Sequence, residues 1–241
     1  MTFGNLFLAA LSDILGSQKE SIAESCKLLG VKGHILPVSY DNTSLVATYA
    51  DGTEVLGEHY IDISNPKVAK QRIVDLRTIP KIKIDSDVRL AIQKADMIIL
   101  GPGDLYTNTV ANLIVSGMSE AIESSMAKVV FVMNLMSRAG ETYGYKSSDF
   151  LDDLSKYLDP DRIDYIVQNI ETSHSPAVLK KYADEGSEPV EDNLGDMWHK
   201  AKVIRARLRS SHKPTIAKAD ALPRSMVRHD PELLAKVIYG I

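Results

Sequence analysis

The pattern of apolar and polar residues divides the chain into helices and strands. Apolar residues cover most sides of the helix predicted at residues 6–15, which indicates a buried element. A second helix is predicted from Ser17 to Gly30, because Ser17 and Glu20 form a capping-box pattern and glycine often ends a helix. Helical spacing also predicts helices at residues 85–94, 117–126, 147–157, 176–183 and 232–239.

Short apolar runs between these helices predict strands. The runs at residues 97–100 and 128–133 are nearly continuous, which is typical of strands buried on both faces of a parallel sheet. Residues 72–79 and 164–168 are predicted as further strands. Because strands and helices alternate from residue 72 onward, we expect an α/β fold with a doubly wound, mostly parallel sheet.

A small antiparallel meander is predicted at residues 33–60, ahead of this sheet. Residues 34–39 are strand-like, and residues 45–49 and 54–59 flank Asp51-Gly52, the strongest hairpin signal in the chain. No internal repeat and no clear linker interrupt the pattern. We therefore expect one α/β domain over residues 1–241, with the meander as an insertion within it.

Composition narrows the class of protein. The 241 residues are 44% hydrophobic, which is enough for one large core, and the net charge of −4 does not favour a nucleic-acid partner. Cys26 is the only cysteine, so the sequence excludes a disulfide framework and fits a reducing cytoplasm. No apolar run approaches the ~18 residues of a membrane span, so no membrane partner is expected.

Two charged stretches lie near the carboxyl end of the chain. Residues 184–196 are acidic and residues 200–218 are basic. They are interpreted first as solvated faces that partly neutralise each other, and alternatively as a basic lip for an anionic ligand.

The strand predicted at residues 97–100 ends in the corner Gly101-Pro102-Gly103-Asp104. Both glycines can take positive φ and let a ligand approach the backbone, while Asp104 is a good N-cap for a helix that begins at Leu105. Strand ends of this kind are where α/β sheets place ligands, often phosphates. A tight turn without a ligand is an equally open interpretation.

A second strand end carries polar residues at positions 134–142. Here Asn134 can donate and accept hydrogen bonds, Arg138 is a candidate for holding a phosphate, and Glu141 is a candidate base or partner of a sugar hydroxyl. In a doubly wound sheet this segment and the glycine corner open onto the same carboxyl edge. The alternative is a long surface loop.

His174 and Arg228 are weaker candidates. His174 follows the strand predicted at residues 164–168 and is a plausible proton carrier, although a lone histidine is more often structural. Arg228 precedes Asp230, the expected N-cap of the last helix, and is interpreted either as a phosphate ligand or as a surface arginine.

Five stretches, in order along the chain, resemble motifs of one protein family. They are residues 3–11 (family string SFGNLFLAAL), 100–107 (GPGSLYTS), 112–118 (NLLVPGI), 134–145 (NLMTQPGETDGY) and 227–231 (the closing motif). The family is that of the bacterial gluconeogenesis factors, which is related to 2-phospho-L-lactate transferase.

The resemblance implies a Rossmann-like α/β fold and a cytoplasmic protein. It implies a non-catalytic regulator that binds a nucleotide sugar or a related phosphorylated small molecule, linked to cell shape and wall synthesis on gluconeogenic carbon. The alternative is the reaction of the transferase branch, which moves phospholactate from a nucleotide diphosphate onto a deazaflavin alcohol with a divalent metal. A third hypothesis is an interaction scaffold that uses residues 33–60 or 200–218, and an assembly of identical copies is left open.

Residue types and resemblance together give the predicted ligand-binding set. It consists of Asn5, Gly101, Pro102, Gly103, Asp104, Leu105, Tyr106, Thr107, Asn134, Arg138, Gly140, Glu141, Thr142, His174 and Arg228.

The chain departs from the family pattern at three places. Asp104 stands where the family has serine, and its negative charge opposes an anion unless a metal or an arginine compensates. Arg138-Ala139 replaces Gln-Pro. The chain begins at the SFGN-like string, so the first strand, the GGGTG-type phosphate loop and the acidic metal-binding residues that the resemblance implies are expected to be missing, and Mg²⁺ is expected only with that segment.

Overall fold

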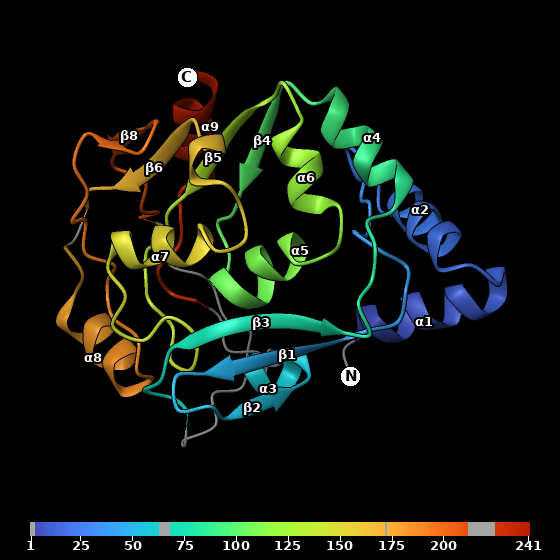
Figure 1. Cartoon of the computed structure of the whole chain (residues 1–241), viewed down its shortest axis with the longest axis horizontal. Coiled ribbons are helices and arrows are strands. Elements are labelled where there is room, and N and C mark those ends of the chain that lie inside the picture. The colour runs from blue at the N-terminus through green and yellow to red at the C-terminus, as the bar shows by residue number, and fades with distance from the viewer. Residues whose placement is uncertain (1–2, 63–67, 172, 212–224) are drawn as a thin grey trace.

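The computed structural model describes residues 3–62, 68–171, 173–211 and 225–241. It contains a five-stranded sheet and a separate three-stranded sheet, with helices around and between them (Figure 1). Within the described residues, none of the helices combines the length and the apolar character needed to cross a membrane.

The five-stranded sheet is mostly parallel, as the sequence predicts. Its order is β4 (Met97–Leu100), β5 (Lys128–Val132), β6 (Tyr165–Asn169), β8 (Ala201–Ala206) and β7 (Met197–Trp198). The first four strands are parallel, and only β7 pairs in the antiparallel sense, with β8.

Helices cover both faces of this sheet, which confirms the doubly wound arrangement. Side chains of β5 alternate: Val129 and Phe131 belong to the large core, whereas Val130 and Val132 belong to a second cluster. The second cluster is covered by α9 (Pro231–Tyr239), and the large core includes side chains of α6 (Met118–Glu123) and α7 (Ser147–Leu154).

The three-stranded sheet corrects two predictions. Its order is β2 (Glu54–Leu56), β1 (Ser44–Tyr49) and β3 (Ile73–Ile79), all antiparallel. The predicted hairpin at Asp51-Gly52 is confirmed, but residues 34–39 form no strand, since Pro37 has no N–H to donate to a ladder. The sequence predicts β3 for the parallel sheet, and it instead supplies the third strand here.

Strand β8 is a further correction, because the sequence places residues 201–206 within a basic segment. Burial alternates along the first three of them: Ala201 and Val203 are buried, and Lys202 is exposed. Such alternation is the signature of a strand, and the frequent charges of the segment conceal it.

A helical segment lies between the two sheets (Figure 1). It consists of the π-helix η1 (Leu105–Val110), which continues into α5 (Ala111–Leu113). The buried Tyr106 hydroxyl lies 2.7 Å from the carbonyl oxygen of Ile73 in β3 and 2.6 Å from the carboxylate of Asp153 in α7. Tyr106 therefore links the small sheet to the helices of the large one.

Helices α2 (Gln18–Leu28), α4 (Ser86–Lys94) and α8 (Pro176–Asp184) agree with the predicted positions. Side chains cap all three at the N-terminus: Ser17 caps α2, Asp85 caps α4 and Ser175 caps α8. The strand predicted at residues 54–59 is too long: β2 ends at Leu56, and the short helix α3 (Glu58–Asp62) begins at Glu58. The 3₁₀-helix η2 (Pro160–Arg162) completes the described fold.

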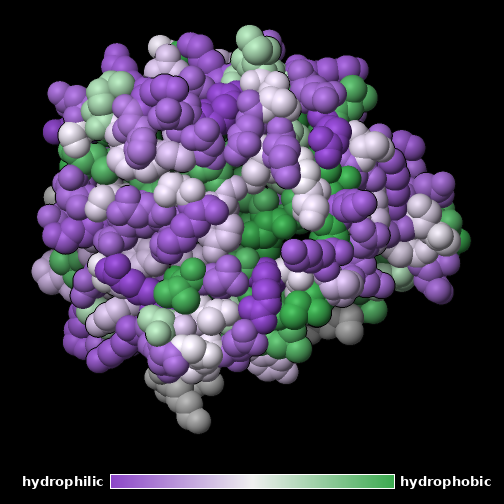
Figure 2. All heavy atoms as spheres, viewed as in Figure 1, coloured by the Kyte–Doolittle hydropathy of each residue, from purple (hydrophilic) through white to green (hydrophobic). Residues whose placement is uncertain are grey.

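The prediction that the first helix is buried is wrong. Helix α1 (Phe3–Leu15) contains no buried residue, and Phe3 and Ile14 are 83% and 77% exposed. The helix packs mainly against α2, where the Ser12 and Ser21 hydroxyls lie 2.6 Å apart. Figure 2 shows further apolar residues at the surface, in a hollow beside α5.

Candidate functional site

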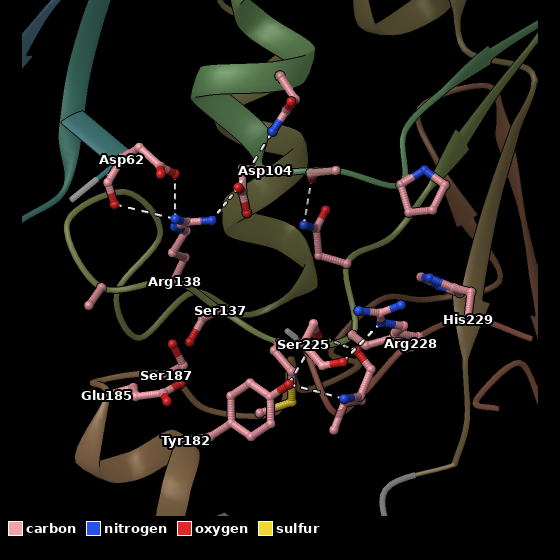
Figure 3. Close-up of a pocket in the computed structure, with 18 of the residues that line it drawn as sticks. Asp62, Asp104, Ser137, Arg138, Tyr182, Glu185, Ser187, Ser225, Arg228 and His229 are labelled. Carbon is pink, nitrogen blue, oxygen red and sulfur yellow. Dashed lines mark hydrogen bonds and ion pairs between the residues drawn. The ribbon is translucent and has the colours of Figure 1, made fainter. Parts of the chain in front are cut away.

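The two polar strand ends meet at the carboxyl edge of the large sheet, as predicted. The Asn134 side-chain amide donates to the carbonyl oxygen of Gly103 at 2.7 Å, and the Arg138 guanidinium pairs with the Asp104 carboxylate. The segment after β5 is therefore joined to the corner after β4 by two side-chain contacts (Figure 3).

The glycine corner has one residue in the left-handed region. Gly101 has φ +80°, and a Cβ there would lie 3.2 Å from the carbonyl oxygen of Val132. Gly103 does not adopt positive φ, but a Cβ added to it would lie 3.3 Å from the Cβ of Asn108. The need for glycine at 101 is therefore conformational, whereas at 103 it is steric.

Asp104 is not the side-chain cap that the sequence predicts. It occupies the N-cap position of η1 but its side chain accepts no capping hydrogen bond. Glu141 takes that role: its carboxylate accepts from the backbone N–H of Tyr106 at 3.1 Å and of Thr107 at 3.4 Å, and from the Thr107 hydroxyl at 2.9 Å. A carboxylate at a helix N-terminus satisfies otherwise unpaired N–H groups.

Arg138 is the centre of an acidic cluster. Its guanidinium pairs with Asp104 and Asp62 (Figure 3). Its Nε lies 3.9 Å from the carboxylate of Glu141. Oxygens of these three acids lie within 4.8 Å of one another. Arg138 thus compensates the charge that Asp104 adds to the corner.

The acidic cluster suits a divalent cation by donor type only. Carboxylate oxygens are ligands that Mg²⁺ accepts. The guanidinium of Arg138, however, already pairs with the oxygens of Asp62 and Asp104. The described residues, as arranged, therefore do not fit a resident metal.

Burial changes the protonation of two of these acids. Desolvation, helped by the nearby Asp104 carboxylate, raises the pKa of the fully buried Glu141 to about 7, against the opposing bonds from Thr107 and the charge of Arg138. Desolvation also raises the pKa of Asp104, because the ion pair with Arg138 offsets it only in part. The interior of the corner therefore resists accumulation of negative charge.

A cavity of ≈ 1030 Å³ opens beside this corner. Its walls come from the two strand ends, from α8 and from residues 225–229. The Tyr182 hydroxyl holds the last of these segments, since it accepts from the backbone N–H of Met226 at 2.9 Å and of Val227 at 3.0 Å. Arg228 also lines the cavity, and its Nε donates to the carbonyl oxygen of Ser225 at 2.9 Å.

The predicted set divides into three groups. Six of its members line the cavity: Pro102, Gly103, Asp104, Asn134, Arg138 and Arg228. A further seven lie directly behind this wall, in the corner, at the start of η1 or in the loop that caps it: Gly101, Leu105, Tyr106, Thr107, Gly140, Glu141 and Thr142. Two lie elsewhere: Asn5 in α1 and His174 after β6.

His174 lies beside Arg209 rather than in the cavity. Its Nδ1 is 3.2 Å from the Arg209 guanidinium, and partial burial together with that positive charge lowers its pKa. Arg209 in turn pairs with Glu171 at 2.5 Å. The geometry therefore places His174 in a separate cluster at the ends of β6 and β8.

Sequence reasoning missed several residues of the cavity wall. They are Asp62, Ser137, Lys181, Tyr182, Glu185, Ser187 and His229. Residues 181, 182 and 185 lie on or just after a helix whose sequence shows only ordinary amphipathic spacing. His229 adjoins the predicted Arg228, so proximity to that motif was the one available signal.

The two charged stretches partly neutralise each other, as first interpreted. Arg205 pairs with Asp192 at 2.7 Å and with Asp196 at 3.2 Å. Lys213 and Lys218 of the basic stretch lie outside the described residues. Arg205 is thus already engaged with the acidic stretch and is a poor candidate for the scaffold surface considered above.

The fold is that of an α/β protein with a cavity at the carboxyl edge of a mostly parallel sheet. The chain belongs to the 2-phospho-L-lactate transferase CofD family, whose model matches residues 1–209. Its relatives include the gluconeogenesis factor of Bacillus subtilis, 32% identical over 241 residues that span all of this chain and 71% of that protein. The gluconeogenesis factor of Halalkalibacterium halodurans is 38% identical over 78% of this chain and 57% of its own length. The family resemblance drawn from the motifs is therefore confirmed.

Solved structures agree with the fold. A crystal structure of a UPF0052 family member from Bacillus halodurans has a TM-score of 0.84 and 33% sequence identity, and the match covers 99% of this chain and 72% of that one. A Thermotoga maritima relative is 42% identical over 79% of this chain. The chain matches only 58% of that relative's length.

Proposed function

We propose that the chain binds a nucleotide sugar in the cavity at the carboxyl edge of the sheet, and acts as a non-catalytic regulator of the gluconeogenesis-factor type in the cytoplasm. The observation that carries the proposal is the division of the cavity wall into two chemically different parts. Lys181 and Arg228 provide cationic groups on one part, where Glu185 also lines the wall, 3.9 Å from Lys181. Asn134, Asp62 and Asp104 provide amide and carboxylate groups on the other part.

Each part suits one half of such a ligand. Arginine and lysine bind phosphate oxygens through charge-assisted hydrogen bonds. Amides and carboxylates bind sugar hydroxyls as acceptors, and the acidic cluster disfavours a phosphate at the glycine corner. A volume of ≈ 1030 Å³ is at the upper end of the range for small-molecule sites, ~300–1,000 Å³, and so suits an extended ligand. The names of the Bacillus subtilis and Halalkalibacterium halodurans relatives support the assignment to this type.

Isothermal titration calorimetry with UDP-glucose and UDP-N-acetylglucosamine tests the proposal. We expect saturable heat with at least one of them, and Arg228→Met should weaken binding about tenfold or more, because it removes one charge-assisted contact. The control is Arg77→Met, which removes an arginine that pairs with Glu54 on the small sheet, away from the cavity wall. No saturable heat with any UDP-sugar would reject the proposal.

A phospholactate transferase is the second candidate. The description of the matching family model and the cluster of three carboxylates support it. The ion pairs of Arg138 with two of those carboxylates count against it. The test is product formation from a nucleotide-activated phospholactate and a deazaflavin alcohol with Mg²⁺, and absence of turnover would reject this alternative.

A further inference from the structure

His229 is held rigidly at the cavity wall by the backbone on either side of it. The N–H of Ser210 donates to the carbonyl oxygen of Arg228 at 2.8 Å, and the N–H of Asp230 donates to that of Leu208 at 2.6 Å. Residues 209 and 229 therefore form an isolated antiparallel bridge. The imidazole projects from this bridge into the wall of the cavity (Figure 3).

The two ring nitrogens have different surroundings. The imidazole is hydrogen-bonded to the backbone of Met133, at the end of β5, whereas Nε2 is buried and has no hydrogen-bond partner. The bonded nitrogen is thus Nδ1, which donates its proton to the Met133 carbonyl oxygen. Burial lowers the pKa of His229 more than this bond raises it, which favours the neutral ring. A neutral ring with the proton on Nδ1 leaves Nε2 as an acceptor.

Two donors near His229 in the cavity wall already have other partners. The Nε of Arg228 donates to Ser225, and the Tyr182 hydroxyl lies 3.0 Å from the Ser225 hydroxyl. A buried acceptor without a donor destabilises the structure that contains it. A ligand that brings a donor to this part of the wall would recover that free energy on binding.

We propose that His229 is a specificity-determining residue whose Nε2 accepts a hydrogen bond from a sugar hydroxyl of the ligand. The proposal rests on the nucleotide-sugar function proposed above and places a sugar hydroxyl at the end of β5, where His229 contacts Met133 and Asn134 of the sugar-binding part of the wall follows. Because Nε2 is closed to water in the described conformation, the bond forms when the seated ligand displaces the side chains that cover it. A ligand that has only acceptors at this position is rejected, because two acceptors cannot form a hydrogen bond with each other.

Two substitutions separate the roles of the two nitrogens. In His229→Gln the side-chain oxygen can stand near the position of Nε2 and keep an acceptor there. In His229→Asn the shorter amide can keep the donor near the position of Nδ1 and loses the acceptor. The matched control is His199→Asn at the turn between β7 and β8, where His199 has φ 49° and asparagine is well tolerated.

The experiment is calorimetry of the whole chain with the UDP-sugar that binds best and with UDP alone. We expect His229→Asn to weaken binding of the UDP-sugar about tenfold and His229→Gln by no more than about threefold, with UDP unaffected by either. Equal losses in both variants, or equal losses for UDP and the UDP-sugar, would overturn the inference. Thermal unfolding of each variant separates loss of binding from loss of folding.

A ligand-free measurement provides a second test. The nitrogen chemical shifts of His229 at pH 7 should show a protonated Nδ1 and an unprotonated Nε2. The opposite tautomer or a doubly protonated ring would contradict the role of His229 while leaving the cavity's function intact. If the unmodified chain binds no UDP-sugar, the proposed function itself is wrong and the assignment of His229 fails with it.

Discussion

Glu141 takes the helix-capping role at the glycine corner that Asp104 is placed to fill. Its carboxylate comes from the loop after β5 and accepts three hydrogen bonds at the start of η1. The same residue is completely buried, so the bonds that hold η1 involve a carboxyl group whose charged form is costly. The stability of the corner should therefore depend on the protonation of this one side chain.

Replacement of Glu141 by glutamine should change the pH dependence of stability. The pKa of Glu141 is raised from 4.5 to about 7, so the folded state binds more protons than the unfolded state between these values. The contribution of Glu141 to the free energy of unfolding is then fully present below pH 4.5 and is lost as the pH rises through about 7. Glu141→Gln should not show this loss. Between pH 4.5 and 7.5, the free energy of unfolding of the variant should therefore rise relative to that of the unmodified chain, by up to about 3 kcal/mol. Urea unfolding at a series of pH values measures the difference, and parallel curves for the two proteins would contradict it. Glu24→Gln, at an exposed position paired with Lys27, should leave the curve unchanged.

Arg138→Met should destabilise the chain because three carboxylates lose one shared counter-charge. The side chains of Arg138, Asp62 and Asp104 are about one-third exposed, so we expect a loss of about 1–3 kcal/mol at pH 7, below the value for fully buried pairs. The loss should shrink at pH 4, where the carboxylates begin to take up protons. Arg77→Met is a matched control: the exposure of Arg77, 37%, nearly equals the 36% of Arg138, but its close partner is the exposed Glu54. Equal losses for the two variants in urea unfolding would refute the shared role.

The outcome at these residues shows what a sequence can reveal about a site. The glycine corner and the polar loop were predictable, because turn residues after apolar runs mark the ends of parallel strands. The partners of Arg138 were not, since Asp104 and Asp62 are 34 and 76 residues away along the chain. Asp62 was not predicted as a site residue, because an acid near a short polar segment is ordinarily solvated.

At the scale of elements, the apolar runs predicted the buried strands and the charges concealed the others. β5 and β6 are recognisable because both of their faces are covered. β4 has the same apolar run, but it lies at the edge of the sheet and its Ile99 is 45% exposed, so the expected burial on both faces is wrong there. β8 pairs with β6 in the same sheet, yet Lys202 and Arg205 made it resemble a solvated run. β3 was placed in the wrong sheet because alternation in sequence gives the order of the elements but not which strands pair.

Helix α9 should depend on its N-cap for part of its stability. Asp230 accepts from the backbone N–H of Glu232 at 3.0 Å and of Leu233 at 3.1 Å, and the helix covers one face of the sheet. Asp230→Ala should lower the free energy of unfolding by about 1 kcal/mol, the usual cost of removing a capping carboxylate. Asp41→Ala, at an exposed position in an irregular segment, is the control for loss of charge alone. Equal unfolding midpoints for these two variants in urea would show that the cap contributes nothing.

At the scale of the whole molecule, exposed apolar side chains are not spread evenly over the surface. The described core lies around the large sheet and the η1–α5 segment, whereas α1 presents apolar side chains to solvent. Phe3, Leu6 and Ile14 are each more than half exposed on this one helix. Apolar side chains gathered on one element mark a contact surface more often than isolated ones do. The expectation that identical copies assemble stays a prediction, and α1 is the element through which it is most readily tested.

Charges introduced on α1 should reduce any self-association of the chain. Burial of apolar area drives association, so a charge placed on both Leu6 and Ile14 opposes contact through this helix. We expect the sedimentation coefficient of the unmodified chain to rise with protein concentration, and that of the double variant Leu6→Glu and Ile14→Glu to stay constant. The matched control places the same charges on two isolated exposed residues, Met126→Glu and Tyr239→Glu, which are 98% and 91% exposed. If this control abolishes association equally, net charge rather than α1 is responsible. If the unmodified chain shows no dependence on concentration, α1 does not bind a second copy.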